Sequence, residues 1–299
     1  MSITPFNASL IPDLSGKIAL VTGGNTGIGY ITCLELVRHN AKVYLGARNK
    51  DRAQEAIKQL KNQVPTAQVE WLSLDLGDLN RVEEAASNFK KKESRLHLLI
   101  NNAGIMATPY ETNKDGIEIQ FATNYIGHFF LTHLLLPTLS LTAKDSAAHQ
   151  VRVVNISSLA HNMAPNGGIN FDDPNNTGRF FLKPWARYAQ SKLANILHAN
   201  YLDRHYSNRG IDFISLHPGS ITCIFKVIYW FAFFVFITPD QGALTTLFAA
   251  TSPKAESGKY YIPFGKEGTI SSCAGDDKLQ DRLYEWTCTK LKSLGYIQD

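Results

Sequence analysis

Cysteine is scarce in this sequence, and none of it is spaced to hold a metal. The 299 residues include four cysteines, at positions 33, 223, 273 and 288. No C-x-x-C pair or other zinc-ligand spacing occurs among them. This pattern excludes a disulfide-dense secreted fold and a cysteine-based metal site, so we expect free thiols in a reducing compartment and no metal.

A strong excess of charge of one sign is also lacking. The net charge at pH 7 is +4, and the basic run at positions 90–92 lies in a stretch typical of a solvated helix. Nucleic-acid-binding domains carry a basic patch or stripe on one face. We therefore expect no nucleic-acid partner.

Neither the N-terminus nor the unbroken apolar stretch at 227–237 has the features of a membrane-spanning segment. Residues 1–15 carry no basic cluster, and Pro5, Asn7 and Pro12 interrupt their apolar positions. An unbroken apolar stretch at 227–237 is shorter than the roughly 20 residues that span a bilayer. We expect neither a signal peptide nor an N-terminal anchor, and a cytoplasmic rather than a secreted protein.

Short apolar runs alternate with helix-like segments along the chain, which predicts an α/β fold. Hydrophobic residues make up 44% of the sequence and charged residues 19%, as in globular proteins. The apolar runs are typical of buried parallel strands. The seven expected strands are 17–22, 42–47, 69–74, 96–100, 150–156, 211–216 and 258–262. No linker, repeat or low-complexity segment separates them, so we expect one domain over residues 1–299.

The first expected strand leads into a glycine-rich turn. Residues 22–29 read Thr-Gly-Gly-Asn-Thr-Gly-Ile-Gly, and a helix is expected from Ile28 to His39. Glycine lets the backbone approach a pyrophosphate closely, and a helix N-terminus offers free N–H groups and a partial positive charge. This strand–turn–helix order predicts a dinucleotide site, with a plain connecting turn as the alternative.

The end of the second expected strand bears on which dinucleotide binds. An acidic residue there would hydrogen-bond the ribose hydroxyls of NAD, whereas a basic residue accommodates the 2′-phosphate of NADP. Arg48, Asn49 and Lys50 follow this strand, and no acid occurs before Asp51. We predict Arg48 as the phosphate partner because a guanidinium matches phosphate geometry. A solvent-facing Arg48 is the alternative.

Tyr188 and Lys192 are four residues apart, which places them on one face of a helix. An ammonium beside a phenol favours the phenolate and lowers the Tyr pKa from about 10. Such a phenol can exchange a proton with a substrate oxygen near neutral pH. The spacing alone is also compatible with an ordinary surface helix.

Together with other motifs, these residues resemble the short-chain dehydrogenase/reductase family. The ordered set continues through Asn101-Asn102-Ala103-Gly104, Asn124, Ser157-Ser158 and His217-Pro218-Gly219. The stretches 124–129, 157–161, 169–173 and 191–195 are similar to the retinol-dehydrogenase-like branch, and 258–263 resembles fungal members. The resemblance covers residues 15–220 closely and 238–299 loosely.

The resemblance implies a single doubly wound Rossmann-type domain, with seven parallel strands and helices on both faces. It implies that Ser158 contacts the substrate oxygen while Ser157 is structural. Tyr188 would transfer the proton, and Lys192 would lower the Tyr188 pKa and bond the nicotinamide ribose. Asn124 would support Lys192 through a water molecule.

The resemblance also implies a cofactor site along the strand ends. Its expected members are Gly23, Asn25, Thr26, Gly27, Ile28, Gly29, Arg48, Asp75, Leu76, Asn101, Asn102, Ala103, Gly104, Tyr188, Lys192, Pro218, Gly219, Ile221 and Thr222. Asp75 would accept a hydrogen bond from the adenine amino group, with a cap on the next helix as an equal alternative. Thr26 stands where NADP-preferring relatives often carry a basic residue. The family's Thr after Pro218 aligns with Cys223, so either Thr222 takes its place or the contact is lost.

Three further segments have expected functions. Residues 1–16 would form an N-terminal extension, 161–184 an insertion over the active-site rim, and 220–238 an apolar substrate loop. Within that loop, 227–237 would be a lid over a lipophilic substrate, a patch contacting a membrane surface, or core or dimer packing. A homodimer is compatible with the sequence.

The expected reaction is hydride transfer between NADP(H) and the carbonyl or alcohol carbon of a lipophilic small molecule. We predict a ketone or aldehyde reductase, with secondary-metabolite biosynthesis as its setting. Two alternatives stay open, which are an NAD-dependent alcohol dehydrogenase of the same fold and a non-catalytic cofactor-sensing protein.

Overall fold

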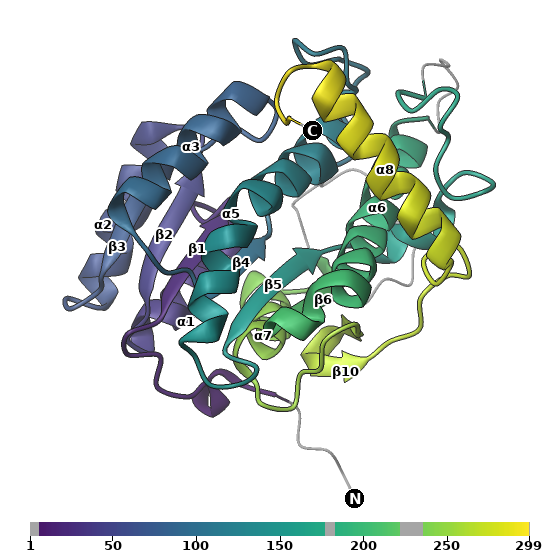
Figure 1. Cartoon of the computed structure of the whole chain (residues 1–299). Coiled ribbons are helices and arrows are strands. Elements are labelled where there is room, and N and C mark those ends of the chain that lie inside the picture. Colours follow the sequence, from purple (N-terminus) through teal and green to yellow (C-terminus); the bar gives the residue numbers. More distant parts are fainter. Residues whose placement is uncertain (1–5, 177–182, 222–235, 299) are drawn as a thin grey trace, which may run out of the picture.

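A computed structural model of the chain describes residues 6–176, 183–221 and 236–298. Its centre is an eight-stranded sheet in the order β10-β9-β6-β5-β4-β1-β2-β3 (Figure 1). The strands are β1 Ile18–Thr22, β2 Lys42–Ala47, β3 Val69–Ser73, β4 Leu98–Asn101, β5 Val151–Ile156, β6 Ile211–Leu216, β9 Tyr260–Ile262 and β10 Lys266–Glu267. Seven of them run parallel, as predicted.

The eighth strand, β10, corrects the predicted count of seven. It pairs antiparallel with β9 at the sheet edge. Phe264 and Gly265 adopt positive φ angles of 67° and 74°, which reverse the chain between the two strands. Both β10 residues, Lys266 and Glu267, are exposed. A strand of two exposed charged residues has no apolar run by which the sequence could predict it.

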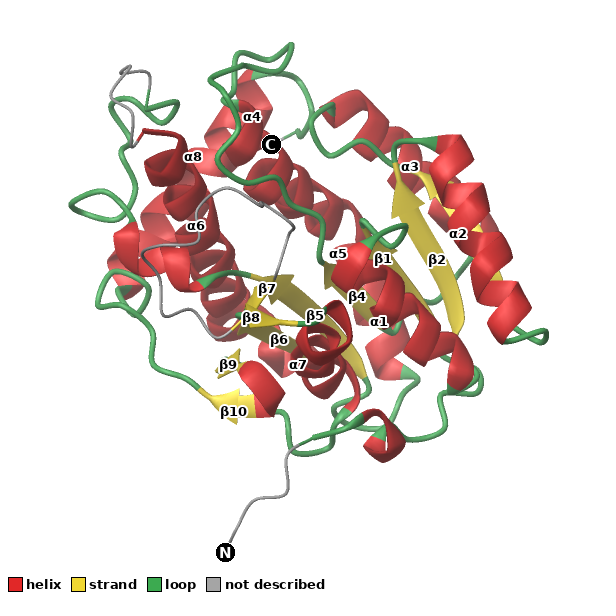
Figure 2. Cartoon of the chain, turned by 180° about the vertical axis from the view of Figure 1, so that it is seen from behind, coloured by secondary structure: helices red, strands yellow, loops and turns green. Residues whose placement is uncertain are grey.

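Helices cover both faces of the sheet (Figures 1 and 2). One face carries α1 Gly27–Arg38, α2 Lys50–Gln63 and α7 Pro239–Thr251, and the other carries α3 Leu79–Lys92, α5 Gly127–Lys144 and α6 Lys183–Tyr206. The amphipathic helix α8 Asp277–Ser293 lies over α6, where the Tyr201 and Tyr284 rings stack at 3.8 Å. Successive β1 residues alternate between the two cores, because strand side chains have a period of two: Ala19 and Val21 face α1, and Leu20 faces α3 and α5.

The apolar segment around Asn124 is divided among three helical elements in the structure. A short turn, α4 Ile119–Phe121, precedes a π-helical turn at Ala122–Ile126, and α5 follows. The segment Ile119–Lys144 is long and apolar enough to cross a membrane by length and composition, but 67% of its most apolar window is buried inside the domain. Its apolarity is therefore accounted for by packing against the sheet and α3.

The chain reverses its direction of winding between β1 and β4, which are neighbours in the sheet. After β1 the chain adds β2 and β3 on one side, and then crosses to add β4, β5 and β6 on the other. Open α/β sheets bind ligands outside the carboxyl ends of strands at such a switch point. The loops after β1, β4 and β5 therefore define where the site lies.

Candidate active site

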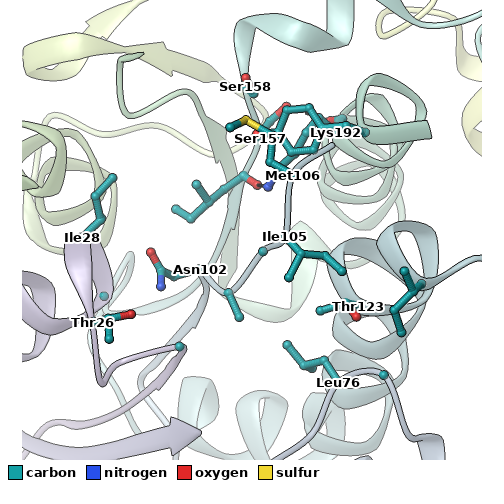
Figure 3. A pocket seen from close by; sticks show the side chains of 18 of the residues that line it. Thr26, Ile28, Leu76, Asn102, Ile105, Met106, Thr123, Ser157, Ser158 and Lys192 are labelled. Carbon is teal, nitrogen blue, oxygen red and sulfur yellow. Dashed lines mark hydrogen bonds between the residues drawn. The ribbon is translucent and has the colours of Figure 1, made fainter. Parts of the chain in front are cut away.

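A cavity of about 1090 Å³ lies along the carboxyl ends of the strands. Its wall includes the glycine turn, the ends of β2 and β3, the loop after β4, the end of β5 and the first turns of α6. In Figure 3, Ser157, Ser158, Lys192 and Met106 gather at one end, while Thr26, Leu76 and Thr123 lie toward the other. The space is at the upper end of the range for small-molecule sites, so it can hold a dinucleotide together with a substrate.

Glycines let the turn after β1 pack closely against the start of α1. Gly23 has φ +66°, and a Cβ on Gly29 would lie only 2.3 Å from the Gly23 carbonyl oxygen. Thr26 precedes α1 in an extended conformation and makes no side-chain cap, so the first N–H groups of α1 stay available. These features fit a pyrophosphate at the helix N-terminus. Gly23, Asn25, Thr26, Ile28 and Gly29 line the cavity, whereas Gly27 turns the chain without reaching its wall.

Thr22 joins this turn to the loop after β4, a role that no sequence motif predicts. Its Oγ1 accepts hydrogen bonds from the backbone N–H groups of Asn102 and Ala103, both at 2.9 Å. The Asn102 side chain returns a bond to the Thr22 carbonyl at 2.8 Å. Asn102, Ala103 and Gly104 line the cavity. Asn101 does not, because its amide is buried and donates to Thr132 and Asn155.

The end of the cavity beside β2 and β3 contains Arg48, Asp75 and Leu76. Asp75 Oδ1 accepts from the Gly77 N–H at 3.0 Å. The helix α3 is capped instead by Asp78, which accepts from the N–H groups of Asn80 and Arg81. The alternative that Asp75 caps this helix is therefore wrong. Arg48 is exposed on the cavity wall and makes no hydrogen bond or ion pair with the other residues the structure describes.

Ser158, Tyr188 and Lys192 come together at the end of the cavity that contains Met106, although they belong to two different segments of the chain. Ser158 follows β5, and Tyr188 and Lys192 face the cavity from α6. The Lys192 ammonium lies 5.7 Å from the centre of the Tyr188 ring. Ser157 also lines the cavity, and its hydroxyl donates to the Lys192 main-chain carbonyl at 2.7 Å.

The predicted lowering of the Tyr188 pKa is not the net effect in this structure. Burial raises the pKa of the Tyr188 phenol, and the opposing effect is a hydrogen bond with Ser158. The Lys192 ammonium donates instead to the Ile156 carbonyl at 3.0 Å, at the end of β5. Tyr188 therefore keeps its proton at neutral pH, which suits a proton donor.

Lys192 is buried, and desolvation lowers its pKa from 10.5 to about 8. Gly104 allows this approach, since a Cβ there would lie 3.3 Å from Lys192 Nζ and 3.4 Å from Asn124 Oδ1. Lys192 Nζ and Asn124 Oδ1 therefore both lie close to Gly104 in the loop after β4.

Asn124 lies in the π-helical turn and is fully buried, outside the cavity wall. Its side chain accepts from the Ile105 N–H at 2.8 Å, and donates to the Ile105 carbonyl and to Ser191 Oγ, both at 2.9 Å. Asn124 therefore fixes the loop after β4 to the helix that carries Tyr188 and Lys192.

The turn after β6 completes this end of the cavity with His217, Pro218 and Gly219. Ile221 belongs to β7 Ser220–Ile221, which pairs with β8 Phe236–Ile237. Thr222, Cys223 and the apolar residues 227–235 lie outside the described residues. Four partly exposed apolar side chains on the cavity wall, which no sequence motif predicts, form what we call the apolar rim: Met106, Leu159, Met163 and Trp185.

Comparison with known proteins gives consistent findings. The family model described as short chain dehydrogenase matches residues 17–171. Short-chain dehydrogenase/reductase drtF of Aspergillus calidoustus is 43% identical over 94% of this chain and 96% of its own length. Retinol dehydrogenase 11 of Mus musculus is 41% identical over 82% of this chain and 76% of its own. The structure of NADPH-bound carbonyl reductase from chicken fatty liver aligns with a TM-score of 0.65 at 26% identity, over 86% of this chain and 100% of that one.

The glycine turn at a topological switch point, facing a serine, a tyrosine and a lysine, is the arrangement of an oxidoreductase that uses a nicotinamide cofactor. The chain belongs to the short-chain dehydrogenase/reductase family and is similar to its retinol-dehydrogenase-like members.

Proposed function

We propose that this protein is an NADP(H)-dependent reductase of apolar ketones or aldehydes. The observation that carries the proposal is the placement of Ser158, Tyr188 and Lys192 at one end of the cavity that begins at the glycine turn. The Tyr188 phenol can supply the proton that reduction of a carbonyl requires at its oxygen.

The side chains divide the reaction between them. When bound, the reduced nicotinamide supplies the hydride that the carbonyl carbon accepts. The Tyr188 O–H donates its proton to the carbonyl oxygen, and the Ser158 hydroxyl donates a hydrogen bond that orients this oxygen. The Lys192 ammonium, within 6 Å of the phenol ring, stabilises the negative charge that develops on the Tyr188 oxygen. The product is the alcohol.

The apolar rim supports a substrate with an apolar body. Trp185 stands one helical turn before Tyr188, with the two rings nearly perpendicular and their centres 6.4 Å apart. Met106 and Met163 are 48% and 60% exposed, which leaves flexible apolar side chains free for contact. An apolar chain or ring lying against these residues would bring a terminal or internal carbonyl toward Tyr188.

The direct test offers the protein NADPH and a panel of carbonyls whose apolar part increases in size. Turnover is monitored as the loss of NADPH absorbance. We expect turnover, with kcat/KM rising as the apolar part grows. A protein that binds NADPH but turns over no carbonyl and oxidises no alcohol would contradict the proposal and favour the cofactor-sensing alternative.

Arg48 is proposed to select NADP(H). Arg48→Ala should weaken NADPH binding by about 10-fold or more, since a charge-assisted contact contributes about 1.5–3 kcal/mol. NADH binding should change little, because NADH has no 2′-phosphate. Fluorescence titration with each dinucleotide measures both dissociation constants. Substitution of Arg52, which is also exposed and lies in the same region, is the control. Equal loss for both dinucleotides would contradict the assignment and favour the NAD-dependent alternative.

Several other expectations stay predictions. These are the contact of residues 227–237 with a membrane surface, the homodimer, the cytoplasmic location and the setting in secondary metabolism.

A further inference from the structure

Two histidines beside the site share one bonding pattern, and the mechanism above uses neither. His128 is 2% exposed and lies in α5, four residues after Asn124. His161 is 1% exposed and lies in the short 3-10 helix Leu159–Met163, three residues after Ser158. Each ring contacts the main-chain carbonyl of the site residue that precedes it.

The protonation of the His128 ring follows from its partners. Nδ1 lies 2.9 Å from the Asn124 carbonyl oxygen, which can only accept, so Nδ1 carries the proton. Nε2 is then an acceptor, 2.8 Å from Thr22 Oγ1. The Thr22 oxygen already accepts from two N–H groups, so its own proton is free to point at the ring. The competing acceptor, the Ile100 carbonyl, is farther away at 3.4 Å.

The His161 ring follows the same logic. Nδ1 lies 2.8 Å from the Ser158 carbonyl oxygen and must donate to it. Nε2 accepts from the Ser271 N–H at 3.3 Å, in the segment before α8. Burial lowers the pKa of His128 to about 4 and also lowers that of His161, so both rings are neutral at pH 7.

We infer that His128 and His161 are positioning residues, each of which fixes the backbone of one site residue through an Nδ1–H bond. His128 holds Asn124 and ties it, through Thr22, to the loop that carries Asn102 and Ala103. His161 holds Ser158 and ties it to the chain before α8. The inference rests on the proposed reductase function, because the two Nδ1–H bonds would act by placing Ser158 and the groups around Lys192 for that reaction.

The bonds are suited to positioning because each one acts at a point where regular structure is interrupted. Asn124 lies within the π-helical turn, whose hydrogen-bond pattern differs from that of an α-helix. Ser158 leaves β5 and immediately caps a 3-10 helix, with its Oγ accepting from the Ala160 N–H at 3.2 Å. A donor fixed on each carbonyl restricts the backbone there without adding a charge.

The test separates the two bonds of each ring. Asparagine places an amide nitrogen near the position of Nδ1, and glutamine places its amide near that of Nε2. We expect His128→Asn and His161→Asn to keep kcat within about 3-fold of wild type. The Gln variants should lose on the order of 10- to 100-fold in kcat, the effect expected when a reacting group is slightly misplaced. KM, the NADPH dissociation constant and the melting temperature are measured alongside.

His198 is the matched control. It is also buried, at 4% exposure, and packs against Phe129, but its ring contacts Asn155 rather than a residue of the site. His198→Asn and His198→Gln should lower the melting temperature and leave kcat unchanged. Equal kcat in the Asn and Gln variants, or an equal loss of kcat at His198, would overturn the inference. A wild-type protein without turnover on any carbonyl would overturn the proposed function and the inference with it.

Discussion

Tyr188→Phe is expected to lower kcat for carbonyl reduction by about 10²- to 10⁴-fold, the range that general acid catalysis contributes. The substitution removes one oxygen and keeps the ring that packs beside Trp185. In the structure the phenol oxygen bonds only Ser158 among the described residues. Folding and dinucleotide binding should therefore change little. Turnover is measured under saturating NADPH, and binding by fluorescence titration.

Tyr201→Phe provides the control for this result. Tyr201 lies on the same helix α6, stacked on Tyr284 and away from the cavity wall. Removal of the Tyr201 hydroxyl should leave kcat at the wild-type value. Near-wild-type turnover by Tyr188→Phe would show that another group protonates the substrate, and the assigned chemistry would be wrong.

The sequence predicts the parts of this site that depend on local pattern. The glycine turn is recognisable because its spacing, the strand before it and the helix after it are contiguous. Tyr188 and Lys192 are recognisable because one helical turn separates them. The ends of the seven parallel strands are predicted within about two residues of their observed positions, because each strand is an apolar run between polar segments.

What the sequence could not predict depends on contacts between distant segments. The direction of the Tyr188 pKa shift depends on the burial of the phenol and on its hydrogen bond with Ser158, which belongs to a different element. The choice between Asp75 and Asp78 as the cap of α3 depends on where the helix begins, and both residues are suitable for a cap. Thr22 and His128 meet across 106 positions, and neither residue type indicates such a contact on its own.

The buried Lys192 also has a cost in stability, and its removal should make the protein more stable. Holding the ammonium in the interior lowers its pKa from 10.5 to about 8, a difference that corresponds to about 3 kcal/mol. Lys192→Met removes the charge and keeps a side chain of similar length. The Ile156 carbonyl stays bonded, because Asn195 also donates to it at 3.0 Å. We expect a free energy of unfolding about 2–3 kcal/mol above wild type at pH 7, together with a loss of turnover.

The pH dependence of this gain distinguishes desolvation from improved packing. Below pH 8 the lysine is charged in both the folded and the unfolded chain, so wild type bears the full desolvation cost. Between pH 8 and 10.5 the unfolded chain binds more protons than the folded one, so wild-type stability rises with pH relative to the variant. The difference between Lys192→Met and wild type in urea unfolding should therefore be largest at pH 7 and shrink toward zero above pH 10. Exposed Lys58 in α2 serves as the control, and Lys58→Met should give a small difference that does not change with pH. A gain at Lys192 that stays constant from pH 7 to 10 would mean that packing, and not the buried charge, sets the stability of this helix.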